Sequence, residues 1–400
     1  MTMNNADNCF DGAELVNKPF LSNKMASELL VRLYGLEAKC LRELPSYCDQ
    51  NFYARAPAAG EKRDGPRADS EFVLKVISGD DSLGQAGSYG EIVTVLLSLR
   101  GDDGVAYPLP VTNLHGGYLS LQRFHREPDG ARGLFLVLLL SYVPGTILSE
   151  VKLSNEVLYG VGRAVARLNK KLLDLKGPFE HLKERAETNM WCLTSVADVE
   201  QYIDGVPDTD HRLLAKSVLD RFVRDVKPIE NTMQKGLIHV DMNRANILVA
   251  PNREPTNREH CSNDVTRTIR QSASHVVTGI IDFNDMACEC LVYDVAGSLA
   301  DMMVGKRGQQ PLVAGGYFLA GYSSVIQLTR TERQSLYVAT AARLAQLLVL
   351  SQEYFRRSGY SDEYIMRIER AGGWQLLKEL WDTPQRKVEA LWEELTLNNS

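Results

Sequence analysis

Two short stretches decide the fold, HVDMNRAN at residues 239–246 and IDF at residues 281–283. Each lies at the end of an apolar, strand-like piece of sequence, so a short hairpin would bring their polar side chains together. In this spacing Asp241 stands where a base would accept a hydroxyl proton, and Asn246 and Asp282 stand where oxygen ligands would hold Mg²⁺. The pattern is typical of phosphoryl transfer.

The alternative interpretation is that these are ordinary surface residues near a turn and at a strand end. Either stretch alone would favour that interpretation. The two together, in this order and at the join between sheet-like and helical sequence, favour a catalytic site. His239 is then expected to fix the loop by hydrogen bonding, because Asp241 already fills the role of base.

The sequence before residue 144 predicts an antiparallel sheet with helices at residues 23–34 and 88–100. Strands are expected at residues 41–56, 71–78, 117–123 and 133–143, with turn residues between them. Beyond that point helical periodicity dominates, at residues 154–175, 212–234 and 330–395. Residues 251–274, rich in Asn, Arg, Thr and Ser, are interpreted as a long exposed loop between two adjacent strands, with a charge-driven binding segment as the alternative.

The composition is that of an ordinary globular protein, with 400 residues, 44% hydrophobic and 24% charged. The net charge of -6 favours neither nucleic acid nor an anionic membrane as a partner. Seven scattered cysteines favour free thiols over a zinc site or disulfides. The N-terminus lacks the pattern of a secretory signal, and the apolar run at residues 134–140 is too short for a membrane span, so we expect a cytoplasmic protein.

The chain resembles the aminoglycoside phosphotransferase-like kinases. The similar stretches run from about residue 19 to residue 380 and are LPSYCDQNFYARA, EFVLKVI, LLLSYVPG, IHVDMNRANILV, GIIDFNDM and LAGYSSVIQLTRTER. The resemblance implies an α+β, bilobal, protein-kinase-like fold. A small antiparallel-sheet N-lobe at residues 21–143 would bind nucleotide, and a larger, mostly helical C-lobe at residues 144–400 would carry the catalytic and acceptor-binding residues. Residues 1–20 are expected to be a flexible lead-in.

Within this family the chain most resembles members that phosphorylate 5-hydroxy-L-lysine with GTP. The resemblance therefore implies a small-molecule kinase that uses Mg²⁺, with GTP or ATP as co-substrate. The residues alone leave open GTP or ATP as donor, and choline, ethanolamine or homoserine as other acceptors. From a different class, a catalytically silent nucleotide-binding protein is the alternative.

The resemblance makes Lys75 the N-lobe lysine that contacts the triphosphate and Glu91 its partner on the following helix. A lysine in the middle of an apolar strand needs a partner, unless it reaches water from an edge strand. Glu91 could equally be a helix-start carboxylate. The segment at residues 46–52 occupies the place of the phosphate-covering loop but has no glycine, so Ser46 and Asn51 are expected to provide the cover.

Two residues depart from the family pattern. Val240 stands where glycine is common, and a β-branched residue would be costly there if φ must be positive. The protein-kinase form of this loop has Arg at that place, so a residue other than glycine is compatible with catalysis. Asn284 replaces a glycine that often follows Asp-Phe, and Asn tolerates the left-handed region. Val240 keeps the catalytically silent alternative open.

Three further positions complete the predicted site. Asp294 resembles a family position that braces the catalytic loop, and a helix-start carboxylate is the alternative. Trp191 and Arg343 are candidates for the acceptor pocket, because a guanidinium could pair with the carboxylate of an amino acid and an aromatic ring could lie near its ammonium group. Ordinary packing is the alternative for both.

Overall fold

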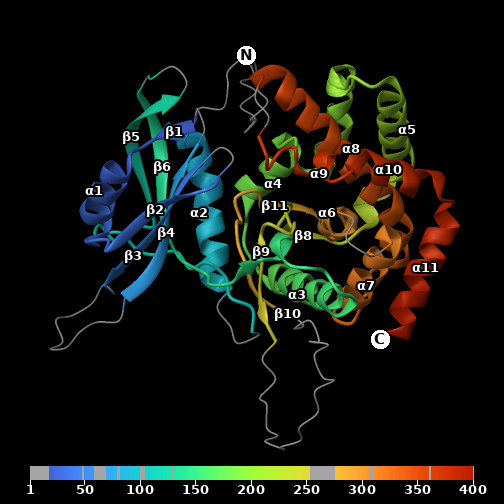
Figure 1. Cartoon of the computed structure of the whole chain (residues 1–400), viewed down its shortest axis with the longest axis horizontal. Helices are drawn as coiled ribbons and strands as arrows, with labels where there is room; N and C mark the ends of the chain where they lie inside the picture. The colour runs from blue at the N-terminus through green and yellow to red at the C-terminus, as the bar shows by residue number, and fades with distance from the viewer. Residues whose placement is uncertain are drawn as a thin grey trace, which may run out of the picture.

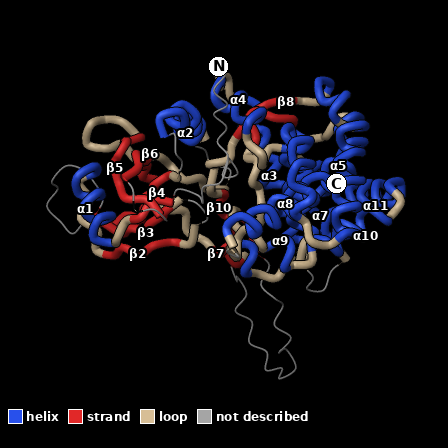
Figure 2. Tube along the Cα trace, turned by 90° about the horizontal axis from the view of Figure 1, so that it is seen from above, coloured by secondary structure: helices blue, strands red, loops and turns tan. Residues whose placement is uncertain are grey.

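Two lobes lie side by side, a β-rich N-lobe and a helical C-lobe (Figure 1). The structure, a computed structural model, describes residues 18–46, 49–57, 69–78, 82–99, 104–127, 130, 132–252, 275–305, 310–359 and 362–399. The tube in Figure 2 separates the same two parts, with most strands gathered in one and most helices in the other. The bilobal α+β fold that the sequence predicts is confirmed.

The N-lobe is built on a six-stranded antiparallel sheet in the order β1-β5-β6-β4-β3-β2. Its strands are β1 (Lys18–Phe20), β2 (Cys40–Leu44), β3 (Gln50–Pro57), β4 (Asp69–Ile77), β5 (Leu119–Glu127) and β6 (Arg132–Ser141). Strand β1 pairs with β5, so residues 18–20 belong to the sheet and not to a flexible lead-in. Residues 1–17, which make up the rest of that predicted segment, lie outside the described residues.

Helix α1 (Asn23–Tyr34) covers one face of this sheet. The hydroxyl of Ser22 caps its first turn, and Gly35, with φ of 64°, ends it in the left-handed conformation. Its buried side chains form one core with inward-facing residues of β3, β4 and β6. The helix begins and ends where the sequence predicts, because periodicity and both caps agree.

Helix α2 (Ser82–Ser98) lies on the other face, toward the C-lobe (Figure 1). Leu74 and Val76 of β4 belong to the core on the α1 side, so the alternation of a strand turns Lys75 to the α2 side. Strand β4 lies between β3 and β6, and Lys75 is only 5% exposed. Lys75 therefore lies on an inner strand, which excludes the alternative that it reaches water from the edge of the sheet.

The C-lobe consists mainly of helices packed around α8. They are α3 (Asn155–Asp174), α4 (Glu180–Thr188), α5 (Thr209–Asp225), α6 (Leu291–Met303), α7 (Pro311–Ser323), α8 (Arg330–Ser358), α9 (Arg367–Arg370), α10 (Gly373–Asp382) and α11 (Gln385–Asn398), with 3₁₀ turns η1 (Leu148–Glu150), η2 (Leu193–Gly205) and η3 (Lys227–Thr232). The sequence pattern does not point to α6, because every residue of this helix is buried and no polar face marks its period. No helix in the described ranges is both long and apolar enough to cross a membrane.

Short strands at the N-lobe side of the C-lobe carry the two deciding stretches. Strands β7 (Thr146–Ile147), β9 (Ile247–Pro251) and β10 (His275–Ile280) form one sheet, and β8 (Lys235–Ile238) pairs with β11 (Ala287–Cys290). Strands β9 and β10 are antiparallel neighbours, as the sequence predicts. The interpretation of residues 251–274 as an exposed loop stays a prediction, because residues 253–274 lie outside the described residues.

The N-lobe segment between α2 and β5 is tied to this hairpin. The backbone N–H of Ala106 donates to the carbonyl of Thr278 at 2.8 Å, and the N–H of Ile280 donates to the carbonyl of Ala106 at 3.0 Å. Pro110 forms a bridge with Leu140 of β6 in the N-lobe sheet. The end of β10, where Asp282 follows, is therefore held directly against this segment of the N-lobe.

Candidate active site

The loop at residues 239–246 joins β8 to β9 and is held by its own side chains. The side-chain amide of Asn246 donates to the carboxylate of Asp241 at 3.0 Å and to the backbone carbonyl of Asp241 at 2.8 Å. The side-chain oxygen of Asn243 accepts the N–H of Ala245 at 2.8 Å. These bonds fix the positions of Asp241 and Asn246 relative to each other. Ordinary surface residues near a turn would not need such bonds.

Asp282 follows β10 and lies at the same end of the hairpin as Asn246. The backbone N–H of Ile281 donates to the carbonyl of Asn246 at 2.9 Å. The Asp282 side chain is 43% exposed, and its backbone has φ of 64°. The structure therefore brings the predicted base, Asp241, and the two predicted metal ligands to one site.

Lys75 reaches this site from the N-lobe. Its Nζ lies 2.9 Å from Oδ1 of Asp282 and 3.6 Å from Oδ2 of Asp49. Burial acts to lower the pKa of Lys75, but the two carboxylates outweigh burial and leave that pKa above its ordinary value. Burial acts to raise the pKa of Asp282, but Lys75 outweighs it and leaves that pKa below its ordinary value. Both groups are therefore charged at neutral pH.

Asp49, to which no sequence motif points, joins the N-lobe to the site. Its Oδ1 accepts the N–H of Ser78 at 3.0 Å, and its Oδ2 accepts the side-chain amide of Asn284 at 2.7 Å. Burial raises the pKa of Asp49, and the opposing charge of Lys75 does not fully compensate. Nothing in the local pattern marks Asp49, because its partners come from distant segments.

Glu91 lies elsewhere than predicted. Its carboxylate accepts the backbone N–H groups of His181 at 3.2 Å and Leu182 at 2.9 Å, at the N-terminus of α4. That helix has no side-chain cap of its own, and its free N–H groups favour a carboxylate. Among the described residues Lys75 pairs with Asp49 and Asp282, and the expected pairing with Glu91 is absent.

Ser46 and Asn51 lie together at the turn between β2 and β3. The side-chain amide of Asn51 donates to the hydroxyl of Ser46 at 3.2 Å, and Asn51 stands opposite Lys75 in the β3–β4 pairing. The Oδ1 of Asn51 is buried and has no hydrogen-bond partner within the described part of the chain. Residues 47–48 lie outside that part, so phosphate cover by this segment stays a prediction.

Val240 adopts the left-handed conformation that would suit a glycine, with φ of 70°. Its N–H donates to Oδ1 of Asp294 at 3.0 Å, and its carbonyl accepts a guanidinium N–H of Arg343 at 3.3 Å. Two buried side chains thus hold the backbone in this strained shape. Asn284, the other departure from the family pattern, does not have a positive φ, and the left-handed residue of its segment is Asp282.

His239 and Asp294 both contact the backbone of the stretches at residues 239–246 and 281–283. His239 is completely buried, its Nε2 lies 3.1 Å from the carbonyl oxygen of Ile281, and its ring packs on Phe283. Asp294 belongs to the first turn of α6, and burial raises its pKa despite the proximity of His239. These contacts agree with supporting roles for the two residues.

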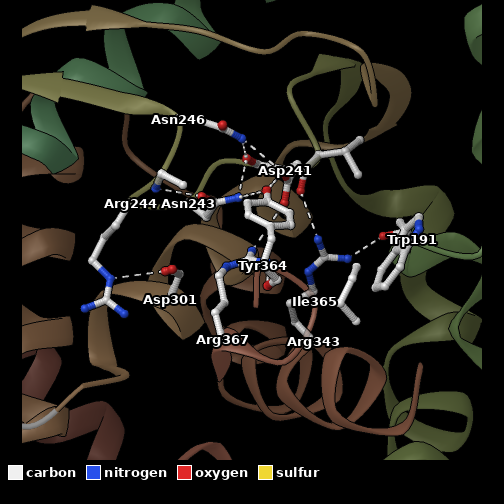
Figure 3. A network of polar contacts seen from close by, with 12 residues as sticks. Trp191, Asp241, Asn243, Arg244, Asn246, Asp301, Arg343, Tyr364, Ile365 and Arg367 are labelled. Carbon is white, nitrogen blue, oxygen red and sulfur yellow. Dashed lines mark hydrogen bonds and ion pairs between the residues drawn. The ribbon is translucent and has the colours of Figure 1, made fainter. Parts of the chain in front are cut away.

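The structure gives Arg343 a role other than acceptor binding. The side chain is 4% exposed, and its guanidinium donates to the carbonyls of Trp191 and Val240 and to the side chain of Gln346 (Figure 3). These bonds use three of the five N–H donors of a guanidinium, and the deep burial of the side chain leaves little of it accessible to a substrate carboxylate. Arg343 therefore joins Trp191 to the 239–246 loop, and Trp191 itself is partly buried against the main core.

Two residues of the C-terminal segment contact Asp241, and no motif points to them. The hydroxyl of Tyr364 donates to Oδ2 of Asp241 at 2.7 Å and accepts the side-chain amide of Asn243 at 3.0 Å. Burial raises the pKa of Tyr364 well above its ordinary value, so its proton stays in place. Arg367, drawn below Asp241 in Figure 3, lies 3.8 Å from Oδ1 of that carboxylate. Both residues are far from Asp241 in the sequence. Only tertiary packing brings them into contact with it, so no local pattern predicts them.

Asp285 adds a carboxylate beside Asp241 and Asp282. It stands in the quoted motif GIIDFNDM, so the motif itself could have pointed to it. Burial raises its pKa to about 7, with the charges of Asp241 and Asp282 acting in the same direction. The site thus concentrates negative charge where a cation would be bound.

The residues present fit a divalent cation held together with phosphate. The amide nitrogen of Asn246 is used by Asp241, which leaves its carbonyl oxygen as the atom suited to a cation. Asn246 and Asp282 are hard oxygen donors, as Mg²⁺ prefers. Within the described ranges no three His, Cys, Asp or Glu residues form a metal site. Such an ion would therefore need phosphate oxygens or water as further ligands.

Known proteins resemble the chain over nearly its whole length. The model of the phosphotransferase enzyme family matches residues 61–256. A hydroxylysine kinase of Danio rerio is 31% identical over 376 residues, which are 94% of this chain and 96% of the relative. A hydroxylysine kinase of Xenopus laevis is 30% identical over 382 residues, 94% of each chain.

Solved structures share the fold at lower identity. An aminopropanol kinase associated with a microcompartment covers 88% of this chain and 95% of its own, with a TM-score of 0.59 and 20% identity. An amicoumacin kinase in complex with AMP-PNP and Ca²⁺ covers 91% of this chain and 95% of its own, with a TM-score of 0.57 and 17% identity. At these identities the likeness concerns the fold.

Proposed function

Because the chain belongs to the hydroxylysine kinase family of phosphotransferases, we propose that it transfers the γ-phosphoryl group of GTP or ATP to the hydroxyl of 5-hydroxy-L-lysine. The product is 5-phosphohydroxy-L-lysine, and the nucleoside diphosphate leaves. One observation carries the proposal. The hydrogen-bonded pair Asp241–Asn246 shares an end of the β9–β10 hairpin with Asp282, in the order that phosphoryl transfer uses.

Asp241 orients the acceptor hydroxyl and accepts its proton as the oxygen attacks the γ-phosphorus. The new O–P bond forms while the bond to the leaving diphosphate oxygen breaks. Asn246 and Asp282 would hold Mg²⁺, which when bound neutralises charge on the phosphate oxygens. His239 and Asp294 support the loop through their buried contacts with Ile281 and Val240.

Lys75 contacts the triphosphate in this proposal. Its ammonium group is fully charged and lies 2.9 Å from Asp282, so phosphate oxygens bound near Asp282 fall within its reach. Ser46 and Asn51 cover the phosphates from the β2–β3 turn, where the Ser46 hydroxyl and the Asn51 amide group lie together and both carry N–H or O–H donors. Glu91 contributes indirectly, by joining α2 to the N-terminus of α4.

The partners in this proposal are a nucleoside triphosphate and a small molecule that carries a hydroxyl and an ammonium group. The concentration of carboxylates at Asp241, Asp282 and Asp285 supports a cationic acceptor. Trp191, partly buried and joined to the 239–246 loop through Arg343, would wall the acceptor site. The protein would work in the cytoplasm, and its net charge of -6 does not favour nucleic acid as a further partner.

A panel of acceptors tests the proposal. We expect phosphorylation of 5-hydroxy-L-lysine with GTP or ATP to exceed that of homoserine, choline and ethanolamine. Asp241→Asn should lower kcat by at least about 100-fold, because the general base is lost while the fold is kept. Preference for another acceptor would correct the substrate. Nucleotide binding without turnover on any acceptor would instead identify a catalytically silent protein.

A further inference from the structure

The two carboxylate oxygens of Asp241 have different surroundings. Oδ2 accepts hydrogen bonds from Asn246 at 3.0 Å and from the hydroxyl of Tyr364 at 2.7 Å. Oδ1 accepts no hydrogen bond from the described residues, and its nearest charged neighbour is the guanidinium of Arg367 at 3.8 Å. Oδ1 is therefore the atom left to accept a hydroxyl proton, so an acceptor bound there lies beside Arg367.

The guanidinium of Arg367 has donors to spare. It stacks on the Tyr364 ring at 4.1 Å and, among the described residues, donates one hydrogen bond, to the carbonyl of Tyr364 at 2.9 Å. Its Nε is buried without a partner in the described part of the chain. A guanidinium has five N–H donors, and a charge with so few bonds is costly where its side chain is only 23% exposed. The arrangement suits an anionic ligand.

The other two arginines labelled in Figure 3, Arg244 and Arg343, bind partners other than Asp241. Arg244 pairs with Asp301 at 3.2 Å, facing away from Asp241 in that view. Arg343 donates to two backbone carbonyls and a side-chain amide. Among the described residues Arg367 is the arginine that lies within 4.0 Å of the Asp241 carboxylate, and it has donors left for a planar anion, which a guanidinium binds with two parallel hydrogen bonds.

We propose that Arg367 binds the carboxylate of an amino-acid acceptor and makes the enzyme prefer acceptors that carry one. This inference rests on the proposed function and adds to it the group that distinguishes an amino acid from an amino alcohol. The guanidinium and Oδ1 of Asp241 lie 3.8 Å apart, so one small molecule can place its hydroxyl on Asp241 and its carboxylate on Arg367. The chemistry first assigned to Arg343 belongs to Arg367.

Two acceptors that differ only in the carboxylate test this assignment, 5-hydroxy-L-lysine and its decarboxylated analogue. With Arg367→Gln we expect KM for 5-hydroxy-L-lysine to rise about 10- to 100-fold, the loss typical of a charge-assisted bond, with a smaller change in kcat. For the analogue both constants should change less than about threefold. The wild-type preference for the carboxylate should therefore disappear.

Arg370→Gln is the matched control. It removes the same charge from the same short helix, where Arg370 is exposed and lies 3.7 Å from Glu363. We expect it to leave both acceptors unaffected. Arg367→Lys keeps the positive charge but loses the planar arrangement of N–H donors, so it should retain part of the preference for the carboxylate. If Arg367→Gln does not fold, Arg367→Lys provides the test instead.

Equal losses with both acceptors would overturn the inference, because Arg367 would then act only through Asp241. An unchanged preference in Arg367→Gln and Arg367→Lys would overturn it as well. Both of these outcomes concern the Arg367 variants and leave the proposed function intact. A wild-type enzyme that phosphorylates neither acceptor would overturn the proposed function and this inference with it.

Discussion

Single residues of the active site hold conformations and charges that they would not adopt alone. Val240 keeps φ of 70° in spite of its branched side chain, because Asp294 and Arg343 bind its N–H and carbonyl. Left-handed backbone costs an ordinary residue on the order of 1 to 2 kcal/mol. The loop geometry is therefore imposed by buried partners, and glycine is not needed to reach it.

This strain has a measurable consequence for stability. Replacing Ala by Gly normally destabilises a folded protein by about 0.5 to 1 kcal/mol. At Val240 we expect the reverse, with Val240→Gly more stable than Val240→Ala by about 1 kcal/mol, because only glycine relieves the positive φ. Urea unfolding of the two variants measures the difference.

Val249 provides the matched pair for that measurement. It is as buried as Val240 but belongs to strand β9. There Val249→Gly should be less stable than Val249→Ala by about 1 kcal/mol. The same order of stability at both positions would contradict the strain at Val240.

Asp285 should make the stability of the protein depend on pH. Its pKa of about 7 in the folded state lies above the ordinary value of 3.8, so the folded state binds the proton more tightly. This contribution favours folding below the ordinary pKa and is lost as pH rises through about 7. Asp285→Asn cannot ionise and should lose less stability than the wild type between about pH 5 and about pH 8.

Unfolding by urea at both pH values, without nucleotide or metal, measures this difference. We expect Asp285→Asn to gain at least about 1.4 kcal/mol on the wild type across the interval, the free energy of one pKa unit. The same substitution at the exposed Asp204 is the control. Parallel pH profiles for wild type and Asp285→Asn would contradict the raised pKa.

At the scale of elements, the C-lobe depends on a close approach between α3 and α7. A Cβ atom added at Gly162 of α3 would lie 2.0 Å from the carbonyl oxygen of Phe318, and one added at Gly321 of α7 would lie 1.9 Å from that of Tyr159. Both obstacles are backbone atoms, which cannot turn aside as a side chain can. The two glycines therefore set the distance at which these helices cross.

Gly162→Ala should destabilise the protein by about 1 to 3 kcal/mol or more, because the helices must move apart. Thermal unfolding with far-ultraviolet circular dichroism measures the loss. Gly160 is the control on the same helix, since a Cβ there meets nothing within 4 Å. Gly160→Ala should be neutral or stabilise by up to about 1 kcal/mol through helix propensity. Equal effects at both positions would exclude close packing as the cause.

At the scale of the whole molecule, charged groups join the lobes at the site. Lys75 and Asp49 belong to the N-lobe, and they bind Asp282 and Asn284 of the C-lobe. A nucleotide held by Lys75, Asn246 and Asp282 would contact both lobes at once. Its binding energy would then stabilise the whole chain rather than one lobe.

Nucleotide with Mg²⁺ should therefore raise the unfolding temperature of the protein in one cooperative step. At a free concentration of about 100 times Kd the added stability is about 2.7 kcal/mol. Asp282→Ala should abolish the part of this increase that requires Mg²⁺, because a metal ligand is lost. Scanning calorimetry with and without chelator measures it. Full Mg²⁺-dependent stabilisation of Asp282→Ala would exclude Asp282 as a ligand.

The two lobes and the trio Asp241, Asn246 and Asp282 could be predicted from the order of residues along the chain. These features depend on local order along the chain, namely alternating strands and polar residues at the ends of two adjacent strands. Helix α1 was equally predictable, because its periodicity and both caps lie within a few residues.

Which distant side chains meet this trio depends on the packing of the folded chain. It pairs Lys75 with Asp49 while Glu91 caps α4, buries Arg343 in structural bonds, and brings Tyr364 and Arg367 to Asp241. The physical reason is that such contacts depend on how whole helices pack and rotate. Packing sums many weak interactions over the entire core, and no short stretch of sequence contains that sum.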